Sequence, residues 1–135
     1  MKTEFAWNDE RHSLELPEMD ATHREFVALL IRAQRAPEAE LLSVLDALLD
    51  HTRAHFEHEA GMMDACALGS RAEHQAEHRR VLAELGQMRT RVEKGRLPFV
   101  RAYLAEAVPD WFATHLATMD ADLAAKYRRM FPGGR

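Results

Sequence analysis

The chain has 135 residues, enough for one domain with its own apolar core, and we expect residues 1–135 to form a single domain. Its formal net charge of −4 arises from well-mixed acidic and basic residues, which argues against a nucleic-acid or membrane-surface partner. The unusual feature of the composition is its eight histidines, because histidine is the side chain that most often binds metal ions.

The sequence also indicates a cellular compartment. The single cysteine, Cys66, excludes an internal disulfide and is compatible with a reducing environment. Residues 1–10 carry no apolar signal segment, and the longest aliphatic run, residues 26–31, is far shorter than the roughly 20 residues that span a bilayer. We therefore expect a cytoplasmic protein without a membrane span.

Residues 1–19 resemble an arm more than a regular element. Pro17 should break any helix before Asp20. Trp7 is expected to pack the arm onto the body of the protein.

The first long helix should be capped by Asp20 or Thr22 and run to about Arg35. His23 enters its apolar face, one turn from the start. Pro37 should open a second helix, at the position where its missing N–H costs nothing, and that helix should end near Ala65.

The second helix carries His55 and Glu59 four residues apart, on a face that is otherwise rich in leucine. The third helix should begin at the capping box Ser70-Arg71-Ala72-Glu73 and place His74 and His78 one turn apart. Gly95 then suits the residue that follows the helix.

The fourth helix should run from about Leu97 to Arg129, followed by a tail at residues 130–135. Pro109 lies inside its pattern, so we expect a kink or a break there. His115 lies on the apolar stripe, and Asp120 follows it by five residues, well round an α-helix.

No strand pattern is present, and short loops make neighbouring helices antiparallel. We therefore predict an all-α, up-down-up-down four-helix bundle over residues 20–129, with an N-terminal arm.

Each of the four helices places at least one histidine on its apolar face. A single such histidine is more often a hydrogen-bonded core residue, but a whole set of buried polar groups would be left unsatisfied without a metal. The set comprises His23, His55, Glu59, His74, His78, His115 and Asp120.

Five imidazoles and two carboxylates are too many for one tetrahedral zinc. They suit two metal ions, with the carboxylates as bridges. A nitrogen and oxygen ligand set without thiolate favours iron or manganese.

Four motifs carry these residues: Asp20-Ala21-Thr22-His23, His55-Phe56-x-x-Glu59, His74-x-x-x-His78 and Trp111-x-x-x-His115-x-x-x-x-Asp120. This set resembles the hemerythrin family. The resemblance covers residues 20–120, and all seven ligand positions of the family carry the expected residue types.

The resemblance implies a non-haem di-iron centre that uses the Fe2+ and Fe3+ states and has an oxo or hydroxo bridge. Its ligands would be His74, His78 and His115 at one iron, His23 and His55 at the other, and Glu59 and Asp120 as bridges. The second iron would keep an open position where dioxygen binds reversibly. The resemblance thus implies oxygen carriage or storage and no enzymatic activity.

Apolar side chains that flank His23 and His115 by helical spacing are expected to line the dioxygen pocket. They are Trp111, Leu116, Phe26 and Phe112. His51 stands where the family usually has an aromatic residue. It is a candidate contact of the site, a candidate proton source, or a surface histidine.

Other functions remain open at this point. One is an oxygen or redox sensory module acting on a separate partner protein, whose identity the sequence does not give. Another is a di-iron enzyme, peroxidase-like or nitric-oxide-handling, which would need a polar group at the open iron. The plainest alternative is a metal-free or zinc-filled bundle.

Overall fold

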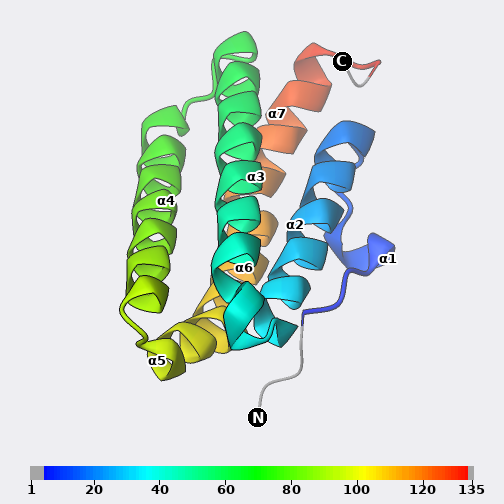
Figure 1. Cartoon of the computed structure of the whole chain (residues 1–135). Coiled ribbons are helices and arrows are strands. Elements are labelled where there is room, and N and C mark those ends of the chain that lie inside the picture. Colours follow the sequence, from blue (N-terminus) through cyan, green and yellow to red (C-terminus); the bar gives the residue numbers. More distant parts are fainter. Residues whose placement is uncertain (1–4, 134–135) are drawn as a thin grey trace.

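The computed structural model describes residues 5–133, and most of these residues are helical (Figure 1). Before the last long helix come α1 (Asp9–His12), α2 (Pro17–Arg35), α3 (Glu38–Ala65) and α4 (Arg71–Glu93). That helix comprises five consecutive segments: α5 (Leu97–Ala102), η1 (Tyr103–Ala107), α6 (Val108–His115), η2 (Leu116–Asp120) and α7 (Ala121–Met130), where η marks a π-helix. The predicted all-α four-helix bundle is confirmed.

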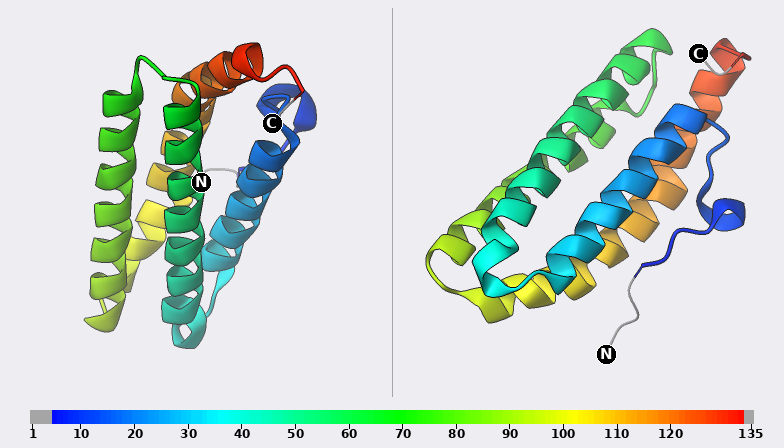
Figure 2. Two further views of the ribbon diagram at one scale, coloured as in Figure 1. Left: turned by 90° about the horizontal axis from the view of Figure 1, so that it is seen from above. Right: turned by 45° about the vertical axis from the view of Figure 1, so that its right-hand side comes forward.

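The central helix of the arrangement is α3, which packs against α2 on one side and α4 on the other. The last long helix completes the bundle, because α5 contacts α4, η1 contacts α2 and α7 contacts α3. Figure 2 shows this helix passing behind α2 and α3. Within the described chain there is no strand, and no helix is long and apolar enough to cross a membrane.

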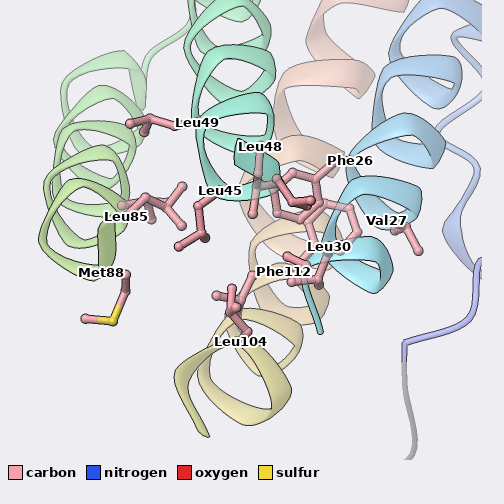
Figure 3. Close-up of a cluster of buried hydrophobic side chains, with 14 of the residues drawn as sticks. Phe26, Val27, Leu30, Leu45, Leu48, Leu49, Leu85, Met88, Leu104 and Phe112 are labelled. Atoms are coloured by element: carbon pink, nitrogen blue, oxygen red, sulfur yellow. The ribbon is translucent and has the colours of Figure 1, made fainter. Parts of the chain in front are cut away.

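Two apolar clusters divide the bundle interior. The larger fills the end that holds α5 and includes Leu45, Leu85 and Leu104 (Figure 3). The smaller fills the end that holds the α3–α4 connection and includes Met63 and Leu123. The buried histidines and acids lie on the helical segments between these two clusters, so both ends of that polar layer are closed by apolar side chains.

The N-terminal arm differs from the prediction. Pro17 does not end a helix but begins α2, since the first helical position needs no N–H donor. Asp20 therefore lies inside the helix and caps nothing. Its buried carboxylate accepts hydrogen bonds from Ser13 Oγ at 2.6 Å and from the Leu14 N–H at 2.9 Å, which fastens the arm to α2.

The caps of two other helices also differ from the prediction. Pro37 was expected at the first helical position. It is instead the N-cap residue, and α3 begins at Glu38. Ser70 does cap α4, but its side chain makes no capping bond and instead donates to Asp122 at 2.8 Å. The predicted capping box is therefore wrong, although Gly95 does follow α4 with a positive φ of 74°.

Pro109 neither breaks nor ends the last helix. The turn before it is the π-helical η1, in which the Val108 N–H donates to the Tyr103 carbonyl five residues back. In this register the next carbonyl, that of Leu104, would require an N–H from Pro109, which has none. Gln34 Nε2 on α2 donates to that buried carbonyl instead, at 2.8 Å. A side chain from a neighbouring helix thus completes the π turn.

Candidate metal centre

A second π turn brings the two chemical groups of the last helix to one face. Along an α-helix, residues five apart point about 140° away from each other. In η2, however, the Ala121 N–H donates to the Leu116 carbonyl five residues back, so one turn takes up an additional residue. His115 Nε2 consequently lies 3.1 Å from Asp120 Oδ1. The sequence prediction missed this, because it assumed a regular α-helix.

All seven predicted site residues meet in the bundle interior, and none is more than 6% exposed. Helix α2 supplies one of them, α3 and α4 supply two each, and the last helix supplies two. They are His23, His55, Glu59, His74, His78, His115 and Asp120.

Three histidines form one group. The Nε2 atoms of His74 and His78 each lie 3.2 Å from Nε2 of His115. The rings meet edge-on or tilted, with centroids 4.5–5.1 Å apart. Three nitrogen atoms therefore point toward one small volume, the arrangement that a bound cation needs.

Two histidines form a second group. The His23 and His55 rings are edge-on, with centroids 4.9 Å apart. His55 Nε2 lies 2.6 Å from Glu59 Oε2, and His23 Nε2 lies 3.5 Å from the same oxygen and 3.2 Å from Asp120 Oδ2.

The two carboxylates divide their oxygens between these groups. Glu59 Oε1 lies 3.5 Å from His74 Nε2 and 3.4 Å from His78 Nε2, whereas Oε2 serves the two-histidine group. Asp120 does the same: Oδ1 lies 3.2 Å from His74 Nε2, and Oδ2 points to His23. Each acid thus lies between two separate sets of imidazoles.

Protein hydrogen bonds leave this cluster incomplete. Buried atoms without a hydrogen-bond partner include His23 Nε2, Glu59 Oε1 and both oxygens of Asp120. Leaving such atoms unsatisfied is costly in an apolar interior. Metal ions would satisfy these acceptors, and the mixture of imidazole and carboxylate suits iron or manganese. The residues present therefore fit a two-metal site.

Without metal, protons balance the buried charges. Burial opposes the charged form of His23 and His74, but the carboxylates of Asp120 and Glu59, 3.2–3.5 Å from their Nε2 atoms, raise the pKa of both histidines to about 9. Burial and the neighbouring imidazoles lower the pKa of His78 to about 3, although the charge of Glu59 opposes this shift. Despite burial, the imidazoles hold the pKa values of both carboxyls below their usual range.

Phe26, Phe112 and Leu116, three of the four predicted pocket residues, are each 2% exposed. The Phe112 ring lies edge-on to His23, with centroids 5.6 Å apart. The Phe26 ring packs against the Phe112 ring, with centroids 4.9 Å apart. The arm adds Phe5, whose ring lies 5.2 Å from Phe112. The sequence analysis missed Phe5, since no helical period connects the arm to the bundle.

Trp111, the fourth predicted pocket residue, lies against the three-histidine group. Its ring stacks on His115 with centroids 4.7 Å apart and an interplanar angle of 24°. Phe56 stacks on His78 in the same way, at 3.6 Å and 2°. Both aromatic rings therefore cover outer faces of this group.

The half-buried His51 has a definite partner. Its Nε2 lies 3.2 Å from the Thr22 carbonyl, which can only accept, so His51 donates there. Its ring centroid lies 6.2 Å from that of His55. His51 thus ties α3 to the residue that precedes His23.

Comparison with known proteins agrees with this geometry. Residues 15–127 match the family model described as the hemerythrin HHE cation binding domain. A bacteriohemerythrin of Ralstonia nicotianae is 34% identical over 116 residues, which cover 86% of this chain and 84% of that protein. Myohemerythrin-1 of Phascolopsis gouldii is 30% identical over 73 residues, about half of each chain: 54% of this one and 55% of that one.

Solved structures show the same fold. A crystal structure of a leucine-to-alanine variant of hemerythrin superimposes with a TM-score of 0.79, covering 91% of this chain and 96% of that one at 19% sequence identity. Together with the family model and the bacterial relative, this agreement shows that the chain belongs to the hemerythrin family.

Proposed function

We propose that this protein is a non-haem di-iron protein of the cytoplasm that binds dioxygen reversibly, for oxygen carriage or storage. Membership of the hemerythrin family supports a di-iron, oxygen-binding protein. The observation that carries the proposal for this chain is the division of each carboxylate between two histidine groups, because one oxygen facing each group is what a bridging ligand requires.

The ligands follow from that division. His74, His78 and His115 would hold one iron, His23 and His55 would hold the other, and Glu59 and Asp120 would bridge them. The group with only two histidines offers one protein ligand fewer, and a metal there would keep an open position. When bound, the irons supply the electrons for reversible dioxygen binding.

The rest of the chain keeps water and proton donors away from the layer of buried histidines and acids. We assign Phe26, Phe112 and Leu116 to the wall of the dioxygen pocket, and Trp111 to the opposite flank beside His115. Apolar walls exclude water and so protect bound dioxygen from protonation.

His51 is the candidate proton donor on α3 beside His55, and its Nε2–H is committed to the Thr22 carbonyl. This arrangement favours a carrier over a peroxidase-like enzyme, which needs a polar group free to act on the bound substrate.

Oxygen uptake tests the function. The protein is loaded with iron under argon, its iron content is measured, and oxygen uptake is followed with an oxygen electrode. We expect two irons and one dioxygen per chain, with the dioxygen released again under argon. His55→Ala should lose iron, whereas His58→Ala, an exposed neighbour on the same helix, should not.

Oxygen that is consumed and not released would overturn reversible binding and favour an enzyme. A chain that binds fewer than two irons would overturn the di-iron centre itself.

A further inference from the structure

Outside the ligand cluster, a continuous chain of contacts leads from His115 to the protein surface. Trp111 Nε1 donates to Glu77 Oε2 at 2.8 Å, and Arg80 donates to Glu77 Oε1 at 3.1 Å. Arg80 also donates to Glu84 Oε2 at 2.7 Å, and the Tyr103 hydroxyl donates to Glu84 Oε1 at 3.0 Å. Two oxidisable side chains, Trp111 and Tyr103, are thus the ends of one network.

The inner end of this network contacts the proposed iron site. The Trp111 ring is stacked on the His115 ring, 4.7 Å between centroids. Tyr103 lies eight residues earlier on the same helix, at the start of η1. Both rings line one cavity of about 110 Å³, walled by Val81, Leu85 and other largely apolar residues.

We propose that Trp111 and Tyr103 form a redox relay, which carries single oxidising equivalents from the metal centre to the surface when the centre meets hydrogen peroxide. This proposal rests on the di-iron centre proposed above. Reduction of one peroxide to two waters consumes two electrons and two protons. When both irons are already ferric they have no electrons to give readily, so side chains would supply these electrons one at a time. A buried site without such a path would be oxidised at its own ligands.

The step balances in electrons and protons. Trp111 gives one electron toward the reduction of peroxide and receives one from Tyr103. A second passage along the same path supplies the other electron, and the two protons that complete the two waters come from solvent. The Tyr103 O–H bond breaks, an O–H bond forms on Glu84, and Tyr103 becomes a neutral radical. A thiol or phenol in solution then returns a hydrogen atom to Tyr103, or an electron while Glu84 returns the proton.

The two carboxylates suit these roles. Glu77 holds a negative charge at the indole N–H, where it stabilises the transient positive charge of oxidised Trp111. Glu84 stands within hydrogen-bond distance of the proton that Tyr103 must release. Burial, followed by the bond to Glu84, raises the pKa of Tyr103, so the hydroxyl keeps its proton until an electron leaves.

The outer end is open to reductants. Tyr103 is half-buried, and the exposed Arg80 lies beside it at the edge of the cavity. A small thiol or phenol therefore reaches the ring without entering the bundle.

Freeze-quench electron paramagnetic resonance tests the relay. Protein loaded with iron and oxidised to the ferric state is mixed with hydrogen peroxide and frozen, and iron content is measured in each variant. We expect a tyrosyl radical signal in the unmodified protein. Tyr103→Phe should abolish it, and Trp111→Phe and Glu84→Gln should suppress it while two irons remain bound.

The sequence offers matched controls, since it contains only two tyrosines and two tryptophans. Tyr127→Phe and Trp7→Phe should both retain the signal. Absence of a radical with two irons bound, or a signal that survives Tyr103→Phe, overturns the relay alone. A chain that does not bind two irons overturns the proposed function, and the relay with it.

Discussion

Replacing Glu59 by glutamine tests the charge balance of the buried cluster in the iron-free protein. Glu59 is one of the two carboxylates that raise the pKa of His23 and His74 from 6.5 to about 9. A shift of that size in one histidine stabilises the folded state by about 2–3 kcal/mol at pH 7. The amide removes one negative charge, so we expect Glu59→Gln to lower the free energy of unfolding by roughly 3 kcal/mol.

The sign of this effect should depend on pH. A raised histidine pKa stabilises the folded state fully below about pH 6.5, and the contribution disappears as the pH rises through about 9. Above that pH the unmodified chain keeps two buried carboxylates without protonated partners. The difference in stability between the two proteins should therefore vanish or reverse, and urea unfolding at pH 7 and above pH 9 measures it.

Glu57→Gln is the matched control, since Glu57 is an exposed carboxylate on the same helix. Its effect should stay within about 0.5 kcal/mol at both pH values. Equal losses for the two variants would refute the reasoning, as would a deficit for Glu59→Gln that does not change with pH.

Three further outcomes follow from the structure. Iron loading at pH 7 should release about two protons per chain, because His23 and His74 must become neutral to bind metal. Titration in weak buffer measures this release, and a value near zero would contradict the raised pKa values of the two histidines. Gln34→Leu should cost about 1–3 kcal/mol in urea unfolding, because it leaves the buried Leu104 carbonyl without its donor; an unchanged midpoint would mean that water replaces the amide. Asp20→Ala should cost a similar amount, about 1–3 kcal/mol, and make the arm more sensitive to limited proteolysis, because two hydrogen bonds to the arm are lost; unchanged cleavage would show that other contacts hold it.

Most of the fold could be predicted from the sequence, because helical periodicity and short connections reflect local physics. The ends of the helices were less predictable. Ser70 begins a capping-box sequence, yet its hydroxyl donates a hydrogen bond to Asp122 on another helix. Pro17 was expected to break a helix, yet it is the first residue of α2. In both places a local rule allows two outcomes, and the sequence alone did not distinguish them.

The site could be predicted as a set of residues but not as a geometry. Helical spacing indicated that seven side chains would meet, and the structure places them together, while their role as ligands stays a prediction. The π turn that brings Asp120 to His115 left no local signal that we could identify. Trp7 packs the arm onto the bundle as predicted, with its ring centroid 6.3 Å from that of His23, whereas no period in the sequence reveals the contact of Phe5.

The central claim is that two metal ions lie side by side, bridged by Glu59 and Asp120. A crystal structure of the protein loaded with iron under argon, with anomalous data collected at the iron edge, tests it most directly. We predict two anomalous peaks per chain, one beside the three-histidine group and one beside His23 and His55, with one oxygen of each carboxylate at each peak. A single peak, or two peaks that share no carboxylate, would contradict the account.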